Sequence, residues 1–314
     1  MQREAKCDWS SFLFDVPSQV KYFLRLSAIG STGLSGGAID WSGVNGTLSN
    51  SNFINSSVSN YGGSVYWSKD YGKIYNCSFN NSVGAFSGGA IYCEGINCSI
   101  ENSTFFNSSL VKSDADGGAI YVVAANFTIN NCNFISNRAT RNGGGIAVSS
   151  NACNARVENC IFDKCTAGSG GAIYLVNITS GLSAYKIISS TFKNCSANYA
   201  GAIYIMGDSN LIDYCNFLDC KATDSGGAIS FACEDSVLNN SYFNNCHAVF
   251  AGAVYVSGDS NLIDCADFYN CNCMAQKTMV VSGSVSWAVT RIMARSKKSG
   301  GNIQLRVMSY ELRV

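Results

Sequence analysis

Apolar and polar residues alternate in short runs that recur along the whole chain. Each run begins with a tripeptide related to Gly-Ala-Ile, whose third residue is Ile or Val, and the second residue after that is apolar again. Such period-two alternation predicts a short strand with one buried face. The residue between the two apolar positions is therefore expected to point away from the core. In six units it is a tyrosine, namely Tyr66, Tyr92, Tyr121, Tyr174, Tyr204 and Tyr255.

The runs return at a nearly constant interval of 25 to 30 residues. A phenylalanine follows each tripeptide, 16 residues later in seven of the nine units. A fixed period of roughly 20 to 50 residues is typical of a solenoid, whose function lies on a repeated surface. The tripeptides begin at Gly37, Gly63, Gly89, Gly118, Gly144, Gly171, Gly201, Gly227 and Gly252.

An asparagine shortly before most of these phenylalanines predicts a turn. In one unit Ile74 and Cys77 are an odd number of positions apart, so both are buried only if the chain turns at Asn76. Asparagine tolerates the left-handed conformation of such a turn, and its amide can bond its copy on the next rung. We expect a buried asparagine ladder, whose members stay unglycosylated even where they open an Asn-x-Ser/Thr sequon. The ladder comprises Asn50, Asn76, Asn102, Asn131, Asn159 and Asn240.

Three short strands per unit, stacked at ~4.8 Å, predict an all-β, single-stranded, right-handed parallel β-helix of about nine rungs. The Leu-x-x-Leu-x-Leu pattern of leucine-rich repeats is absent, and a propeller blade needs roughly 40 to 50 residues. We expect residues 35–278 to form the β-helix, residues 1–34 an N-terminal cap or truncated region, and residues 279–314 a basic tail or cap.

Two units, Gly88-Gly89-Ala90-Ile91-Tyr92 and Gly117-Gly118-Ala119-Ile120-Tyr121, together with Asn131-Cys132-Asn133-Phe134, carry a family resemblance. They resemble the polymorphic outer-membrane protein repeat of adhesin-like β-helix proteins on archaeal and bacterial cell surfaces, over roughly residues 35–278. Among the nine phenylalanines that follow the tripeptides, one opens the companion Phe-x-x-Asn motif of that family, at Phe134–Asn137. The resemblance implies a cell-surface or extracellular protein that binds glycans or surface proteins of another cell. Such proteins usually carry a signal peptide and an anchor, and since neither is visible we expect a fragment.

Charge changes this picture little. The formal net charge is zero, which gives no reason to expect a nucleic-acid partner. Residues 36–278 carry 11 Lys/Arg and 17 Asp/Glu, a net of −6, whereas residues 279–314 carry 6 and 1, a net of +5. We expect the basic end to be a solvated face. No apolar run reaches the ~20 residues of a transmembrane helix.

The sixteen cysteines fall largely into columns of the repeat. Serine replaces cysteine within a column, which favours buried free thiols, although stacked rungs also permit disulfides. The spacings do not resemble a zinc site, and the single histidine, His247, is expected to be structural or at the surface. The two main columns are Cys77, Cys132, Cys160 and Cys215, and Cys165, Cys195, Cys220, Cys246 and Cys271.

Three acidic residues, Asp208, Glu234 and Asp259, occupy one position in three consecutive rungs. Stacked carboxylates repel, which raises a pKa or recruits Ca²⁺. Polysaccharide lyases on this fold use such clustered acids, so these residues are catalytic and calcium candidates. The alternative, which we favour, is a solvated turn copied by duplication, with no cofactor.

Three functions remain. The leading one is a non-enzymatic, adhesin-like protein whose outward tyrosines stack on sugars or bury against a partner, although each ring also has its own copy to pack on. The second is a polysaccharide lyase or glycoside hydrolase centred on the acidic column. The third is a structural spacer of a surface layer.

Overall fold

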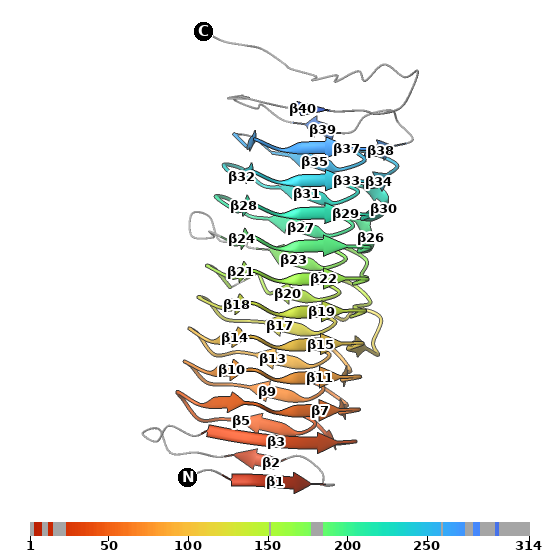
Figure 1. The fold of residues 1–314 in the computed structure, drawn as a ribbon. Helices are drawn as coiled ribbons and strands as arrows, with labels where there is room; N and C mark the ends of the chain where they lie inside the picture. The colour runs from red at the N-terminus through yellow and green to blue at the C-terminus, as the bar shows by residue number, and fades with distance from the viewer. Residues whose placement is uncertain are drawn as a thin grey trace.

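The computed structural model is a parallel β-helix of about nine turns of ~26 residues, without helices in its described part (Figure 1). The structure describes residues 3–7, 12–14, 23–150, 152–176, 185–258, 260–273, 279–282 and 293–294, and side chains from Leu26 to Asn272 within them. All strand pairings in this part are parallel, and each strand pairs with its copy one turn away. The predicted fold class is therefore confirmed.

The first sheet is built from the Gly-Ala-Ile strands. Their alternation of buried and half-buried residues is the one expected from sequence, for example in Val65–Trp67. The strands are β2 (Phe12–Phe14), β5 (Ile39–Trp41), β9 (Val65–Trp67), β13 (Ile91–Cys93), β17 (Ile120–Val122), β20 (Ile146–Val148), β23 (Ile173–Val176), β27 (Ile203–Met206), β31 (Ile229–Ala232), β35 (Val254–Ser257) and β39 (Met279–Ser282).

The second sheet contains two strands from each turn, separated by the asparagine bend. At its start β1 (Arg3–Cys7) pairs with β3 (Phe23–Ile29), which pairs with both β6 and β7. The strands before the bend are β6 (Thr47–Ser49), β10 (Lys73–Tyr75), β14 (Ser99–Glu101), β18 (Thr128–Asn130), β21 (Arg156–Glu158), β24 (Lys186–Ile188), β28 (Leu211–Asp213), β32 (Val237–Asn239) and β36 (Leu262–Asp264). Those after it are β7 (Asn52–Ile54), β11 (Ser78–Asn80), β15 (Thr104–Phe106), β19 (Asn133–Ile135), β22 (Ile161–Asp163), β25 (Thr191–Lys193), β29 (Asn216–Leu218), β33 (Tyr242–Asn244), β37 (Asp267–Tyr269) and β40 (Met293–Ala294).

Most turns also contain a fourth short strand, whereas the sequence predicted three strands per unit. These strands form two separate four-stranded sheets. The first comprises β4 (Thr32–Gly33), β8 (Ser57–Val58), β12 (Val83–Gly84) and β16 (Ser109–Leu110), and the second β26 (Ser196–Tyr199), β30 (Lys221–Ser225), β34 (His247–Ala248) and β38 (Asn272–Cys273).

The core is a set of columns in which like residues stack on like. The phenylalanines form one continuous column from Phe53 to Phe268, with centroids 4.6 to 5.0 Å apart and interplanar angles of 16° or less. The longer units do not interrupt it, because Phe134, Phe162 and Phe192 remain stacked. Insertions are therefore absorbed in the connections rather than in the core.

The bends repeat a left-handed backbone conformation at fixed corners. Asn50, Asn76, Asn102, Asn131, Asn159 and Asn240 all have φ between 45° and 53°. Asn76 Nδ2 donates to Asn50 Oδ1 at 2.7 Å, and Asn131 Nδ2 donates to Asn102 Oδ1 at 2.5 Å, so an amide ladder exists. It is discontinuous, since Asn159 donates to Asn130 and Asn240 donates to Asp213.

The ladder lies at the surface, so the expectation that it is buried was wrong. Asn76 is exposed and Asn102 half-exposed. A corner residue in the left-handed conformation points outward, while the next small residue, such as Cys77 or Ser103, turns into the core. A second ladder at the following corner was missed, in which Asn81 donates to Asn55 at 3.0 Å and Asn107 to Asn81 at 2.7 Å.

The ends of the β-helix are only partly described. β2 pairs with β5, and β39 pairs with β35, so parallel stacking extends into both flanking regions. The basic residues Arg291, Arg295, Lys297 and Lys298 lie outside the described residues. Within the described part, no helix has the length and apolar character needed to cross a membrane.

Candidate functional site

The predicted tyrosine face consists of stacked rings on the outer side of the first sheet. Tyr66, Tyr92 and Tyr121 stack with centroids 5.4 Å apart at each step, and Tyr174 stacks on Tyr204 at 5.3 Å. Each ring therefore packs on its copy, so most ring faces are occupied. These tyrosines are half-buried, so part of each side chain remains accessible. Ligand binding by this face stays a prediction.

The tyrosine face is not continuous. Ala147 stands between Tyr121 and Tyr174 in the register of the sheet, and Ser230 stands between Tyr204 and Tyr255. The face is thus divided into a stack of three rings, a stack of two, and Tyr255 alone.

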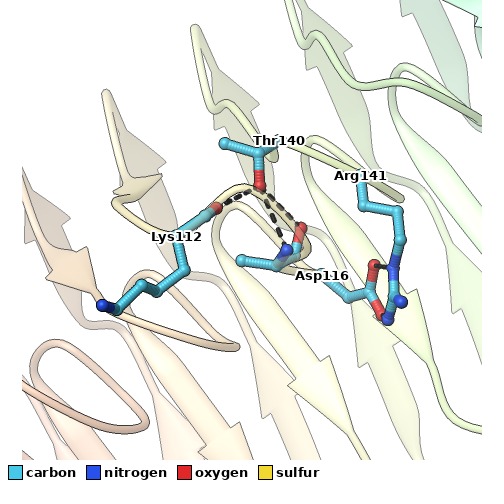
Figure 2. Close-up of polar contacts among 5 residues, drawn as sticks. Lys112, Asp116, Thr140 and Arg141 are labelled. Atoms are coloured by element: carbon cyan, nitrogen blue, oxygen red, sulfur yellow. Dashed lines mark hydrogen bonds and ion pairs between the residues drawn. The ribbon is translucent and has the colours of Figure 1, made fainter.

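An ion pair lies near the first of these gaps (Figure 2). Arg141 Nε donates to Asp116 Oδ1 at 2.9 Å, and Arg141 Nη2 donates to Asp116 Oδ2. Asp116 is buried, whereas Arg141 is about half-exposed. Burial raises the pKa of Tyr121 and of Tyr174, and the Arg141 charge partly offsets this in both, so the pair acts on both stacks.

Thr140 fixes the loop that carries Asp116 (Figure 2). Its hydroxyl donates to the Lys112 carbonyl at 2.6 Å and accepts the Ala115 N–H at 3.1 Å. This loop lies in a unit three residues longer than its neighbours. We conclude that the insertion is held in place by the next turn, and that bidentate pairing orients Arg141 at the edge of the tyrosine face.

The acidic column serves the turns. Asp208 Oδ1 accepts the Glu234 N–H of the next turn at 3.0 Å. Asp70, at the equivalent position of an earlier turn, accepts the Ile96 N–H at the same distance. Asp259 lies outside the described residues. No group of three or more His, Cys, Asp or Glu side chains in the described part is placed to hold a metal. The hydrogen bond of Asp208 agrees with the turn interpretation, and calcium binding stays untested.

The cysteine columns are buried and unbridged. The fourteen cysteines whose side chains the structure describes are all free thiols. Cys165 and Cys195 donate to the Phe134 and Phe162 carbonyl oxygens of the preceding turns at 3.4 and 3.6 Å. Burial raises the pKa of Cys215 to about 12 and that of Cys77 to about 11. These two thiols therefore carry little thiolate at neutral pH and are poor nucleophiles or ligands.

A groove lies over β26, β30, β34 and β38, and the sequence did not predict it. Its volume is about 840 Å³. The buried alanines Ala197, Ala222 and Ala248 form its floor, because their side chains are too small to fill the space between the residues flanking them. The lining is completed by Thr166, Ala167, Ser196, Asn198, Lys221, Thr223, His247, Val249 and Asn272.

The two sides of the groove follow the sheet register. On one side Ser196, Lys221, His247 and Asn272 are partners in successive turns. On the other side the Thr223 hydroxyl donates to Asn198 Oδ1 at 3.1 Å. His247, expected to be structural or at the surface, therefore lies at the surface in a groove.

The sequence did contain a signal for this groove. The tripeptide Cys-x-Ala occurs in four consecutive units, at Cys165, Cys195, Cys220 and Cys246. Its cysteine was assigned to the core and its alanine was overlooked. Because the residue between them varies among Thr, Ser, Lys and His, a single unit gives no indication of a shared surface.

A scan of protein-family models finds none that matches this chain, and a search of curated proteins finds no match either.

Proposed function

We propose that this protein is a non-enzymatic, adhesin-like β-helix, presented at a cell surface or outside the cell, that holds a glycan in the groove. The groove itself supports this proposal. Successive turns contribute a small floor residue and a polar side chain beside it, at the ~4.8 Å spacing of stacked strands. A chain of repeating units lying along the groove therefore meets repeating contacts.

The chemistry of the lining agrees with a sugar ligand. Thr166, Ser196, Asn198, Thr223 and Asn272 offer hydroxyl and amide groups that both donate and accept hydrogen bonds. The alanine floor supplies apolar contact beneath them. A pocket with apolar walls and a few convergent polar groups is the usual form of a small-molecule site.

Binding without catalysis is favoured by where the carboxylates lie. The usual glycosidase mechanism needs two of them flanking the scissile bond. The lining residues that the structure describes include none, and Asp208 holds the backbone of the next turn. The polysaccharide-degrading alternative, on Asp208, Glu234 and Asp259, is kept as an outcome of the test.

The test is a glycan-array measurement with the purified chain and two variants. Thr223→Trp fills the groove from an exposed position, and Thr32→Trp is its matched control, an exposed threonine in β4. We expect Thr223→Trp to lose glycan binding and Thr32→Trp to keep it. Equal binding by both variants would exclude the groove, and no binding by the unmodified chain would exclude a glycan ligand.

The same preparations distinguish the enzymatic alternative. Soluble reducing ends are measured after incubation with polysaccharides, with and without Ca²⁺. Release that disappears in Asp208→Asn would make the protein an enzyme; we expect none.

A further inference from the structure

We infer that the groove selects acidic glycans, with Lys221 and His247 as the residues that bind the sugar carboxylates. This inference rests on the proposed function, that the groove holds a glycan, and specifies the chemical class of that glycan.

The first argument is the charge of the lining. Among the described residues that line the groove, Lys221 and His247 are the ones with titratable side chains. This contrasts with the rest of the β-helix, since residues 36–278 carry 17 Asp/Glu against 11 Lys/Arg. A basic groove in an acidic solenoid concentrates anions locally, where most of the surface repels them.

The second argument is the relative position of Lys221 and His247. Lys221 in β30 and His247 in β34 are register partners in adjacent turns, so their backbones are separated by one ~4.8 Å strand spacing. Lys221 is exposed and forms no ion pair with any described residue. Its ammonium group is therefore available to a ligand beside the imidazole.

The third argument is the orientation of the imidazole. Asn245 Nδ2 donates to Asp219 Oδ1, so the Asn245 amide oxygen is the atom that faces His247 Nε2, at 2.9 Å. An amide oxygen only accepts, so His247 Nε2 carries a proton. When the ring is protonated, Nδ1–H is the second donor, and a charge-assisted hydrogen bond to a carboxylate uses it.

The probe is hexagalacturonate, with its methyl ester as a matched ligand that keeps the sugar backbone and removes the charges. Isothermal titration calorimetry is expected to give an affinity for the acid about tenfold or more above that for the ester, as for a hydrogen bond to a charged group. Added NaCl is expected to weaken binding of the acid and not of the ester.

Three variants locate the effect. Lys221→Gln and His247→Asn are each expected to weaken acid binding by about tenfold and leave ester binding unchanged. Lys186→Gln, an exposed lysine of β24 outside the groove, is the control and is expected to bind like the unmodified chain. Thermal melting followed by circular dichroism checks that each variant is folded.

The outcomes separate this inference from the proposed function. Equal affinity for acid and ester, or acid binding that neither groove variant weakens, overturns the acidic selection and leaves glycan binding standing. Hexaglutamate that binds as tightly as hexagalacturonate overturns the glycan class, because the groove then recognises charge alone. If neither these sugars nor any array glycan binds, both proposals are wrong.

Discussion

At the scale of single residues, core packing depends on the combined size of two facing residues, one at each end of the link between two strands of the same turn. Trp41 and Trp67 stack with centroids 4.6 Å apart, and each faces a glycine of its own turn. A Cβ atom at Gly46 or Gly72 would lie 2.2 Å from the facing indole ring. In later turns the indole is replaced by a smaller residue and the glycine by a larger one, as with Val122 and Phe127.

Gly72→Ala tests this pairing. Since the added methyl group meets the Trp67 ring, we expect the free energy of unfolding to fall by about 1–3 kcal/mol, as for overpacking in a dense core. Urea unfolding measures the change. The double variant Trp67→Leu/Gly72→Ala should lose less than the sum of its single variants. Additive losses would show that the two positions do not compete for space.

At the scale of the turn, two physical effects coincide at each asparagine corner. The left-handed conformation costs an ordinary residue roughly 1–2 kcal/mol and is tolerated by asparagine and glycine. The side-chain amide adds a bond to the neighbouring turn, as between Asn131 and Asn102. Ser189, Tyr214 and Cys265 keep the same conformation, with φ of 49°, 51° and 47°, so stacking enforces the corner even without the amide.

Two substitutions at Asn131 separate these effects. Asn131→Gly removes the amide bond and keeps the conformation accessible, so we expect a loss of about 0.5–1 kcal/mol. Asn131→Leu also introduces backbone strain, and we expect a loss of about 1–3 kcal/mol. Both are measured by chemical unfolding. A leucine variant as stable as the glycine variant would contradict the assigned strain.

At the scale of the whole molecule, the parts predicted from sequence are those repeated within each unit. The Gly-Ala-Ile strand, the phenylalanine column and the asparagine bend have fixed spacing, so periodicity alone located them. The groove was missed because it belongs to no single unit. Lys221 and His247 become neighbours only when turns stack, and the small floor residue Ala222 gives no local signal. The stacked tyrosines were located correctly, and the ring geometry bears out the alternative that these rings pack on their copies in adjacent turns.

Those buried thiols whose pKa is raised are expected to make the stability of the β-helix depend on pH. Burial raises the pKa of Cys215 from its ordinary value of 9.0 to about 12 and that of Cys233 to about 11. Between pH 9 and the raised pKa of each thiol, the folded chain keeps a proton that the unfolded chain releases. The stability that this thiol contributes below pH 9 is therefore lost as the pH rises through that range. Each such thiol adds a slope of up to about 1.4 kcal/mol per pH unit.

Urea unfolding under reducing conditions from neutral to alkaline pH measures this slope. Cys215→Ser, which copies Ser190 and Ser241 of the same column, should make it shallower, and an unchanged slope would mean that this thiol ionises equally in both states.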